Sequence, residues 1–131
     1  MEDKEKDKKK ILIIDDTKPI RMLLYMKLKN EFDCLLASNG KEAIQIAKDE
    51  KDSIDVIISD YEMPKMNGYQ TLRVMRLFVK KAPVIMLSGS LNESRIKELM
   101  SLGVRKFLAK PVNFHRLYEE LNNIFKEKNI Q

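Results

Sequence analysis

Five short apolar runs, separated by segments with helical periodicity, constrain the fold of this chain more than any other feature. The first run, at residues 11–14, is too short to require a helix and is rich in β-branched side chains, as buried strands are. The runs span residues 11–14, 34–37, 56–59, 84–87 and 104–108. Such alternation predicts βαβ units, whose parallel strands are joined by right-handed crossovers with helices on both faces of the sheet. We therefore expect a doubly wound α/β fold.

Capping and turn residues predict where the helices begin and end. The expected helix starts are Thr17 with Pro19, the turn Ser38-Asn39-Gly40, Gly68, Asn92 and Asn113. Gly103 stands where a C-terminal glycine would end a helix. The charged pair Arg105-Lys106 lies inside the last predicted strand, which indicates an edge strand rather than a central one.

Length and composition fit one folded domain. The chain has 131 residues, of which 44% are hydrophobic and 34% are charged. We expect a polar leader over residues 1–9 and a folded domain over 10–128. The formal net charge is +5, but the basic run from Lys4 to Lys10 is mixed with acids and has no interleaved aromatics. This pattern is typical of a solvated leader rather than of a nucleic-acid-binding arm.

Several classes of protein are disfavoured by what the sequence lacks. The single cysteine, Cys34, cannot form an intramolecular disulfide and fits a reducing compartment. The sequence shows no signal-peptide pattern, no apolar run of membrane-spanning length and no helix-turn-helix pattern for binding DNA. We therefore expect a cytoplasmic protein that does not bind DNA directly.

Polar residues follow four of the five predicted strands. They are Asp15 and Asp16 after the first strand, Asp60 after the third, Ser88 after the fourth and Lys110 after the fifth. In doubly wound sheets, ligands bind beyond the carboxyl ends of the strands, where the strand order reverses. We therefore expect these five side chains to converge on one edge of the sheet.

The chemistry of this set favours a hard cation and an aspartate nucleophile. Three carboxylates at close range repel one another, and oxygen ligands with open positions suit Mg²⁺. Lys110 is suited to stabilising a transferred phosphoryl group. Acyl transfer by Ser88 would need a general base, and the one histidine, His115, falls in the last predicted helix as a surface residue.

These residues and motifs together resemble the receiver domains of two-component response regulators. The resemblance covers about residues 11 to 125 and includes the acidic pair after the first strand, Ser-Gly after the fourth and Lys-Pro after the fifth. Its longest motif is Asp-x-x-Met-Pro-x-Met-Asn-Gly, which begins at Asp60. The resemblance implies a flavodoxin-like (βα)5 fold with a parallel sheet of strand order 2-1-3-4-5, as in the chemotaxis-type regulators.

The resemblance also implies roles for the site residues. Asp60 is expected to accept a phosphoryl group from a histidine kinase, a phosphotransfer protein or a small phosphodonor. Asp15, Asp16 and Asp60, with the backbone carbonyl of Glu62, are expected to bind Mg²⁺. Ser88 and Lys110 would contact the phosphoryl oxygens, so the protein would catalyse phosphoryl transfer onto itself and its own dephosphorylation without being a turnover enzyme.

A conformational switch follows from the same resemblance. Ser88 would move toward the phosphate and Phe107 would turn inward, although Phe107 lacks a tyrosine hydroxyl and simple core filling is an equal interpretation. The downstream target would bind the face made by the helix after Asn92, the strand 104–108 and the last helix. That face is expected to carry Arg95, Arg105, Lys106, Arg116 and Tyr118.

Two positions are expected to tune how long the phosphoryl group lasts. Glu62 and Ser90 each follow a site residue by two positions, where the family controls access of the hydrolytic water. We expect the Glu62 carboxylate to make the site more anionic and to repel a phosphate unless Lys110 or the metal draws it aside.

Other functions remain open at this point. A receiver-like binding module could act without phosphorylation. An FMN binder would need a loop rich in Ser, Thr and Gly after the first strand, where this chain has Asp15 and Asp16. A phosphohydrolase would need a substrate-selecting cap, for which the chain has too few residues. The chain could act alone, which its starting Met1 and polar end favour, or be a receiver excised from a larger regulator. We expect a monomer or a weak phosphorylation-dependent dimer, and the sequence identifies neither the kinase nor the target.

Overall fold

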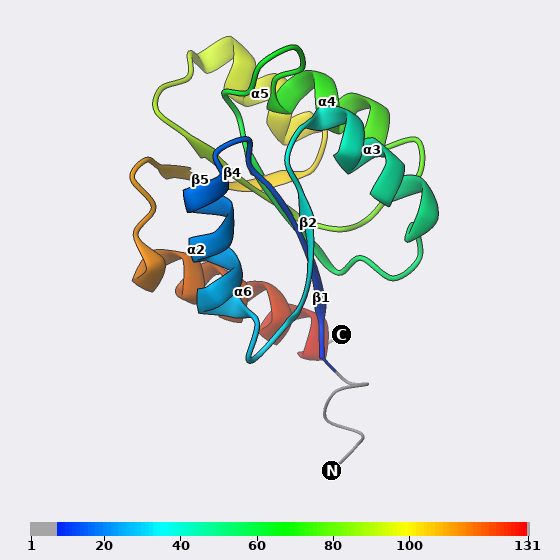
Figure 1. Cartoon of the computed structure of the whole chain (residues 1–131), viewed down its shortest axis with the longest axis vertical. Coiled ribbons are helices and arrows are strands. Elements are labelled where there is room, and N and C mark those ends of the chain that lie inside the picture. The colour runs from blue at the N-terminus through cyan, green and yellow to red at the C-terminus, as the bar shows by residue number, and fades with distance from the viewer. Residues whose placement is uncertain (1–7, 131) are drawn as a thin grey trace.

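A computed structural model describes residues 8–130 and shows a five-stranded sheet covered by five helices (Figure 1). The strands are β1 (Lys10–Ile14), β2 (Asp33–Ala37), β3 (Val56–Asp60), β4 (Val84–Ser88) and β5 (Val104–Ala109). The helices are α2 (Lys18–Leu28), α3 (Gly40–Asp49), α4 (Gly68–Met75), α5 (Glu93–Ser101) and α6 (Phe114–Ile130). Every predicted strand and helix is present, and strands and helices alternate as expected.

The sheet is parallel throughout, with strand order β2-β1-β3-β4-β5. This confirms the doubly wound, flavodoxin-like fold with order 2-1-3-4-5. The order reverses at β1, which pairs with β2 on one side and with β3 on the other. The carboxyl ends of β1 and β3 therefore lie next to each other at the switch point.

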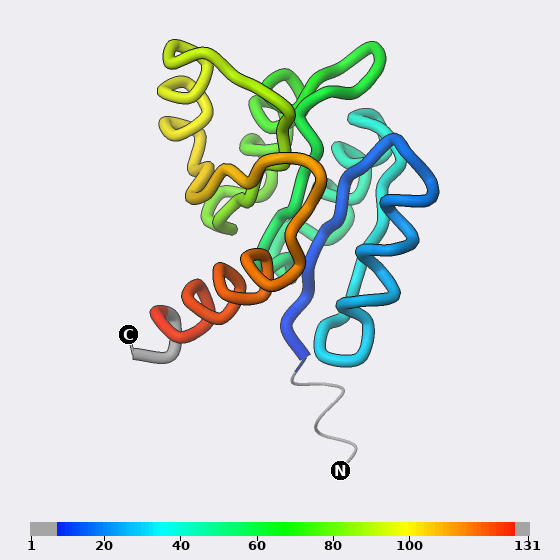
Figure 2. Tube along the Cα trace, turned by 90° about the vertical axis from the view of Figure 1, so that its left-hand side faces the viewer, coloured from blue at the N-terminus to red at the C-terminus, as the bar shows by residue number. Residues whose placement is uncertain are grey.

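Two apolar layers hold the helices to the sheet. Side chains alternate between the faces along each strand, so Leu12 and Ile14 enter one layer while Ile11 and Ile13 enter the other. The first layer is completed by α3, α4 and α5, and the second by α2 and α6. Figure 1 shows these two groups of helices on opposite sides of the sheet, and in the view of Figure 2 β1 runs between α2 and α6, which cover the same face. With both faces covered, the central strands read as unbroken apolar runs.

The predicted helix caps are mostly confirmed. Asn39, Asn92 and Asn113 each accept a hydrogen bond from a backbone N–H in the first turn that follows. Asn67, which was not predicted as a cap, does the same for α4. Thr17 lies at the predicted N-cap position of α2, but its side chain makes no capping hydrogen bond. Its backbone N–H instead donates to Oδ1 of Asp15, at 2.8 Å. Thr17 therefore orients the Asp15 carboxylate and does not cap the N-terminus of α2 with its side chain.

The edge position of β5 is confirmed, and a register shift in its pairing with β4 explains how Arg105 and Lys106 can both be exposed. Val84 pairs with Val104 whereas Ile85 pairs with Lys106, so Arg105 is an extra residue in the ladder. Both Arg105 and Lys106 are exposed as a result. The Arg105 guanidinium binds the carboxylates of Glu120 and Glu127 on α6.

The predicted leader and domain limits are not tested by the structure. Residues 1–7 of the leader lie outside the described residues, and β1 begins at Lys10, beside the expected boundary. No helix in the described part of the chain is long and apolar enough to cross a bilayer.

Arg76 joins three segments at the end of the sheet opposite to Asp60. Its guanidinium donates to the carbonyls of Val79, Ala82 and Leu102, at 3.1, 2.7 and 2.6 Å. Gly103 lies directly beneath this guanidinium and has a φ of +96°, a conformation that side-chain-bearing residues rarely adopt. A side chain at Gly103 would be strained and would also displace Arg76.

We therefore expect Gly103→Ala to lower the free energy of unfolding by about 1 to 3 kcal/mol, measured by urea denaturation. Gly89→Ala is the matched control, because a Cβ at Gly89 would meet nothing within 4 Å. The control should stay within about 0.5 kcal/mol of wild type. Equal losses in the two variants would contradict this account of Gly103.

Candidate functional site

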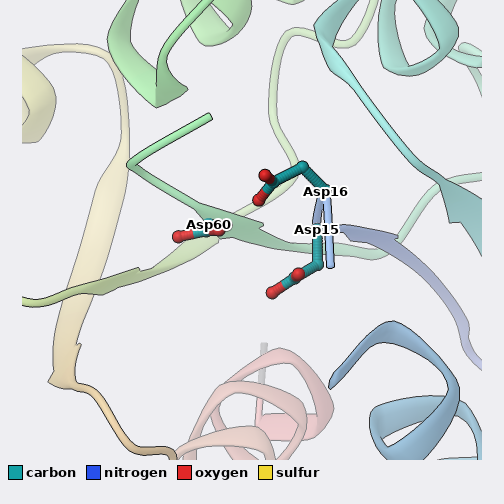
Figure 3. A group of neighbouring side chains, drawn as sticks. All are labelled: Asp15, Asp16 and Asp60. Atoms are coloured by element: carbon teal, nitrogen blue, oxygen red, sulfur yellow. The ribbon is translucent and has the colours of Figure 1, made fainter. Parts of the chain in front are cut away.

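Three aspartates converge at the switch point of the sheet (Figure 3). Asp15 and Asp16 follow the last residue of β1, and Asp60 is the last residue of β3. Ile14 pairs with Ser59, so the two strand ends are in register. The extended backbone of each strand thus delivers its carboxylate to the same place, as the sequence predicted.

The three carboxylates form a group that fits a hard divalent cation. One oxygen from each lies within 4.8 Å of the others. Asp15 and Asp60 are each only 2% exposed, whereas Asp16 is partly exposed. A donor set of carboxylate oxygens, open on one side, suits Mg²⁺ completed by water, and the group contains no sulfur or imidazole donor that would favour zinc.

Lys110 supplies the positive charge nearest to Asp60. Its ammonium forms an ion pair with Oδ1 of Asp60 and lies 3.2 Å from Oε1 of Glu62. The lysine follows β5, and its backbone N–H donates to the carbonyl of Ser88, which fixes the loop. Burial lowers the pKa of Lys110, but its bonds to Asp60 and Glu62 outweigh burial and raise that pKa, so the ammonium stays charged.

Burial dominates the electrostatics of the aspartates. It raises the pKa of Asp60 to about 6, against the lowering effect of Lys110 and with a further increase from Asp15. Burial also raises the pKa of Asp15, opposed by the hydrogen bond from Thr17 and reinforced by Asp16. A carboxylate that is costly to ionise in a water-poor site is a candidate functional group, and a bound cation would offset the cost.

Ser88 lies at the end of β4 and is 7% exposed. Its hydroxyl donates to Oε2 of Glu62 at 2.9 Å. The backbone N–H of Gly89 points to Oε1 of the same glutamate at 3.4 Å. Burial raises the pKa of Glu62, but the bonds from Ser88 and Lys110 prevail and hold it below the usual value. Lys110 therefore draws the Glu62 carboxylate toward Ser88, and not away from the groups that are expected to contact a phosphoryl group.

Several residues that shape the site were not predicted from the sequence. Arg21 donates to the backbone carbonyl of Asp15 at 2.8 Å, and Thr17 and Gly89 contribute backbone N–H groups. Arg21 lies one helical turn after Thr17, so its position over the strand end was readable from the helix pattern. Backbone N–H donors are common to almost every residue type, so the sequence gives no signal for their position.

Of the residues predicted to tune or switch the site, Ser90 contacts Ser88, whereas Phe107 lies within β5. The backbone N–H of Ser90 donates to the Ser88 hydroxyl oxygen at 3.2 Å, and the residue is exposed. Phe107 is half-buried and packs against the apolar layer beneath α3, α4 and α5. The tuning role of Ser90 and the switch role of Phe107 stay predictions.

The predicted output face is partly wrong. Tyr118 was placed on it, but the Tyr118 hydroxyl donates to the carbonyl of Lys27 in α2, on the other side of α6. Arg95 lies over the ring of Tyr69, with 4.1 Å between its guanidinium carbon and the ring centroid. Lys106 and Arg116 are exposed as expected. His115 is 84% exposed and lies 3.8 Å from Glu119, which confirms it as a surface residue.

An apolar groove opens beside Asp60. It has a volume of about 470 Å³ and reaches Asp60 and Lys110. Its apolar lining comes from Ile20, Leu23, Leu87, Pro111, Val112 and Phe114. Ile20 and Leu23 are 40% and 42% exposed, and Met22 and Met26 continue the exposed apolar strip along α2. Exposed apolar surface next to a polar site is typical of interaction surfaces.

The raised pKa of Asp60 predicts how the stability of the metal-free protein depends on pH. Because this pKa lies above the ordinary 3.8, the folded state binds more protons than the unfolded state between about pH 4 and pH 6. Stability contributed by Asp60 therefore falls as pH rises through that window. In the presence of a metal chelator, Asp60→Asn should raise the free energy of unfolding at pH 7.5 by about 1 to 3 kcal/mol, because it removes a buried charge.

Urea unfolding at pH 7.5 and pH 4 measures this effect, and the gain should shrink at pH 4. Asp52→Asn, an exposed change of equal charge, should show no such pH-dependent gain. A gain for Asp60→Asn that is the same at both pH values would contradict the assignment.

Comparison with known proteins places these features in a family. The profile of the response regulator receiver domain matches residues 11–122. The chain is 34% identical over 118 residues to the transcriptional regulatory protein CpxR of Escherichia coli K12, covering 89% of this chain and 49% of CpxR. It is 31% identical over 126 residues to a histidine kinase of Formosa agariphila, covering 95% of this chain and 9% of the kinase. The chain thus spans less than half the length of these relatives.

Solved structures agree with this relationship. The chemotaxis protein CheY4 of Vibrio cholerae superposes with a TM-score of 0.81 at 29% identity, covering 89% of this chain and 98% of that one. A response regulator receiver domain protein from Clostridium thermocellum gives 0.83 at 32% identity, covering 93% and 98%. With the aspartate cluster at the switch point and Lys110 beside it, the sequence match shows that this chain belongs to the response regulator receiver domains of two-component systems.

Proposed function

We propose that this chain is a phosphorylation-activated switch that accepts a phosphoryl group on Asp60 and signals through protein contacts. The single observation that supports this most is the ion pair between the buried Asp60 carboxylate and Lys110, inside a group of three aspartates. This arrangement places a nucleophile, a cation site and a phosphoryl-stabilising ammonium together.

The proposed step is an in-line displacement at phosphorus. A carboxylate oxygen of Asp60 bonds to the phosphorus atom, while the bond to the donor breaks. The donor is a phosphohistidine nitrogen or the acyl oxygen of a small phosphodonor, and it leaves with the bonding electron pair. Lys110 and the Ser88 hydroxyl then contact the phosphoryl oxygens, where charge-assisted hydrogen bonds are strongest.

Asp15, Asp16 and Asp60, with the backbone carbonyl of Glu62, would hold Mg²⁺. When bound, the ion neutralises the carboxylates and the incoming phosphoryl oxygens. The chain itself contributes by excluding water from Asp15 and Asp60, each 2% exposed, and by orienting Asp15 through the Thr17 N–H.

A protein phosphodonor is favoured by the surface around Asp60. The apolar groove between α2 and the loop after β5 runs directly to the carboxylate. Its continuation over Met22 and Met26 suits the apolar side of a partner that presents a phosphohistidine, such as a sensor histidine kinase or a phosphotransfer protein. A small phosphodonor would reach Asp60 without using this strip.

The output is proposed to be a change in partner binding. A phosphoryl group adds about 1.5 to 2 negative charges and three acceptor oxygens beside Ser88 and Lys110. Movement of Ser88 would pull the loop after β4 and bias α5, with Phe107 filling the space behind it. The face of α5, β5 and α6, with exposed Lys106 and Arg116, would present this change to a downstream protein.

The remaining features of the proposal concern the whole protein. We propose a cytoplasmic monomer, or a weak phosphorylation-dependent dimer, that does not bind DNA itself and transfers phosphoryl onto itself rather than turning over a substrate. The same receiver could serve as part of a larger regulator. A module that binds partners through this edge without phosphorylation is the alternative, and a covalent assay separates the two.

We expect wild-type protein incubated with Mg²⁺ and acetyl phosphate to gain the mass of one phosphoryl group. Asp60→Asn should gain none, because its amide cannot act as the nucleophile, and chelation of Mg²⁺ should suppress the wild-type product. Intact-protein mass spectrometry at neutral pH measures this, with Asp52→Asn as the charge-matched control. A covalent product on Asp60→Asn would remove Asp60 from the mechanism, and an unreactive wild type would favour the module that works without phosphorylation.

Phosphoryl lifetime is proposed to depend on Glu62 and Ser90, which flank the reacting edge. Glu62→Asn should change the rate of autodephosphorylation by about tenfold, a difference of about 1.4 kcal/mol in barrier height. The decay of phosphorylated protein after removal of the donor measures this rate. Unchanged lifetimes in the Glu62→Asn protein would refute the tuning role of this residue.

A further inference from the structure

The carboxylate of Glu62 occupies a set of converging donors next to Asp60. The Ser88 hydroxyl donates to Oε2 at 2.9 Å, while the Lys110 ammonium lies 3.2 Å and the Gly89 N–H 3.4 Å from Oε1. Both oxygens of one carboxylate are therefore engaged by groups from two different strand ends. The side chain remains 46% exposed, so it has an open path to solvent.

These donors are the ones that a phosphoryl group on Asp60 would need. Lys110 contacts Glu62 and Asp60 at the same time, so the two carboxylates flank a single ammonium. Ser88 is 7% exposed and belongs to the strand that pairs with β3, with Asp60 opposite Leu87. An anion bound to Asp60 would meet Ser88 and Lys110 where Glu62 now meets them.

We call the Ser88 hydroxyl, the Gly89 N–H and the Lys110 ammonium the phosphoryl-binding cradle. We propose that the Glu62 carboxylate occupies this cradle at rest and must leave it before Asp60 can hold a phosphoryl group. This inference rests on the proposed function and adds its regulation. A carboxylate and a phosphoryl group cannot share the Ser88 hydroxyl proton, and at close range they repel each other. Each phosphorylation event therefore breaks the contacts of Glu62 with Ser88, Gly89 and Lys110.

The same contacts hold the loop after β4 in its resting position. The Ser88 hydroxyl donates to Glu62 while its oxygen accepts from the Ser90 N–H, so the turn 88–90 is tied to the loop after β3. Release of Glu62 frees the Ser88 hydroxyl and the Gly89 N–H together. Glu62 thus competes with a phosphoryl group for these donors, and it is hydrogen-bonded to the turn 88–90 that leads toward α5.

If Glu62 competes by occupying the cradle, its effect depends on the length of its side chain, whereas simple charge repulsion of a phosphoryl group depends on its charge. Glu62→Gln keeps the length of the side chain but removes the charge. Glu62→Asp keeps the charge but is one methylene shorter, so it cannot span to Ser88 and Lys110. Occupation of the cradle predicts that both changes weaken the competitor, whereas repulsion alone predicts that Glu62→Asp behaves as wild type.

The test is the affinity for beryllofluoride in the presence of Mg²⁺, measured by isothermal titration calorimetry on the full chain. Hydrogen bonds to charged groups contribute enough that Glu62→Gln and Glu62→Asp should each bind about tenfold more tightly than wild type. Glu31→Gln, an exposed charge change on the loop before β2, is the matched control and should bind as wild type. Hydrogen exchange of the Gly89 amide without Mg²⁺ or beryllofluoride should be faster in both Glu62 variants.

Each outcome decides the proposal. Tighter binding by both Glu62 variants supports it, and wild-type affinity of either Glu62→Gln or Glu62→Asp overturns it while leaving the proposed function intact. If wild-type protein binds no beryllofluoride although it is folded, the proposed function fails, and the competitor role falls with it.

Discussion

The ion pair between Asp60 and Lys110 is the interaction on which the rest of the site depends. Asp60 is almost fully buried and has two further carboxylates close by, an arrangement that is unfavourable without a cation. Lys110 provides one positive charge from the neighbouring end of β5, and the fold leaves room for a metal ion to provide more. A bound divalent cation would offset the carboxylate charge that Lys110 alone leaves unbalanced.

The fold separates this site from the interactions that secure the domain. Asparagine caps and the two apolar layers fix the helices, while Arg76 and Gly103 join segments at the opposite end of the sheet. The loops after β3, β4 and β5 are then free to carry the polar residues. Contacts between those loops, such as that of Glu62 with Ser88, lie outside the two apolar layers, as the proposed switch requires.

Much of this arrangement was predictable from the sequence because strand ends and helix caps have local signals. The five apolar runs located the strands, and the positions of Asp15, Asp60 and Lys110 after them predicted a shared edge. Tyr118 was misplaced because the predicted helix pattern identified its buried stripe but not which flank faced α2. The Thr17 N–H and the three contacts of Glu62 depend on loop geometry, which residue spacing does not determine.

A crystal structure of the protein with Mg²⁺ and beryllofluoride would show which groups hold an anion at Asp60. We expect the beryllium group on a carboxylate oxygen of Asp60, with its fluorines contacting Lys110 and Ser88 and with Glu62 withdrawn toward solvent. A beryllium group on another residue would contradict the role of Asp60. An adduct on Asp60 with Glu62 still bound to Ser88 and Lys110 would contradict the exchange of one anion for the other.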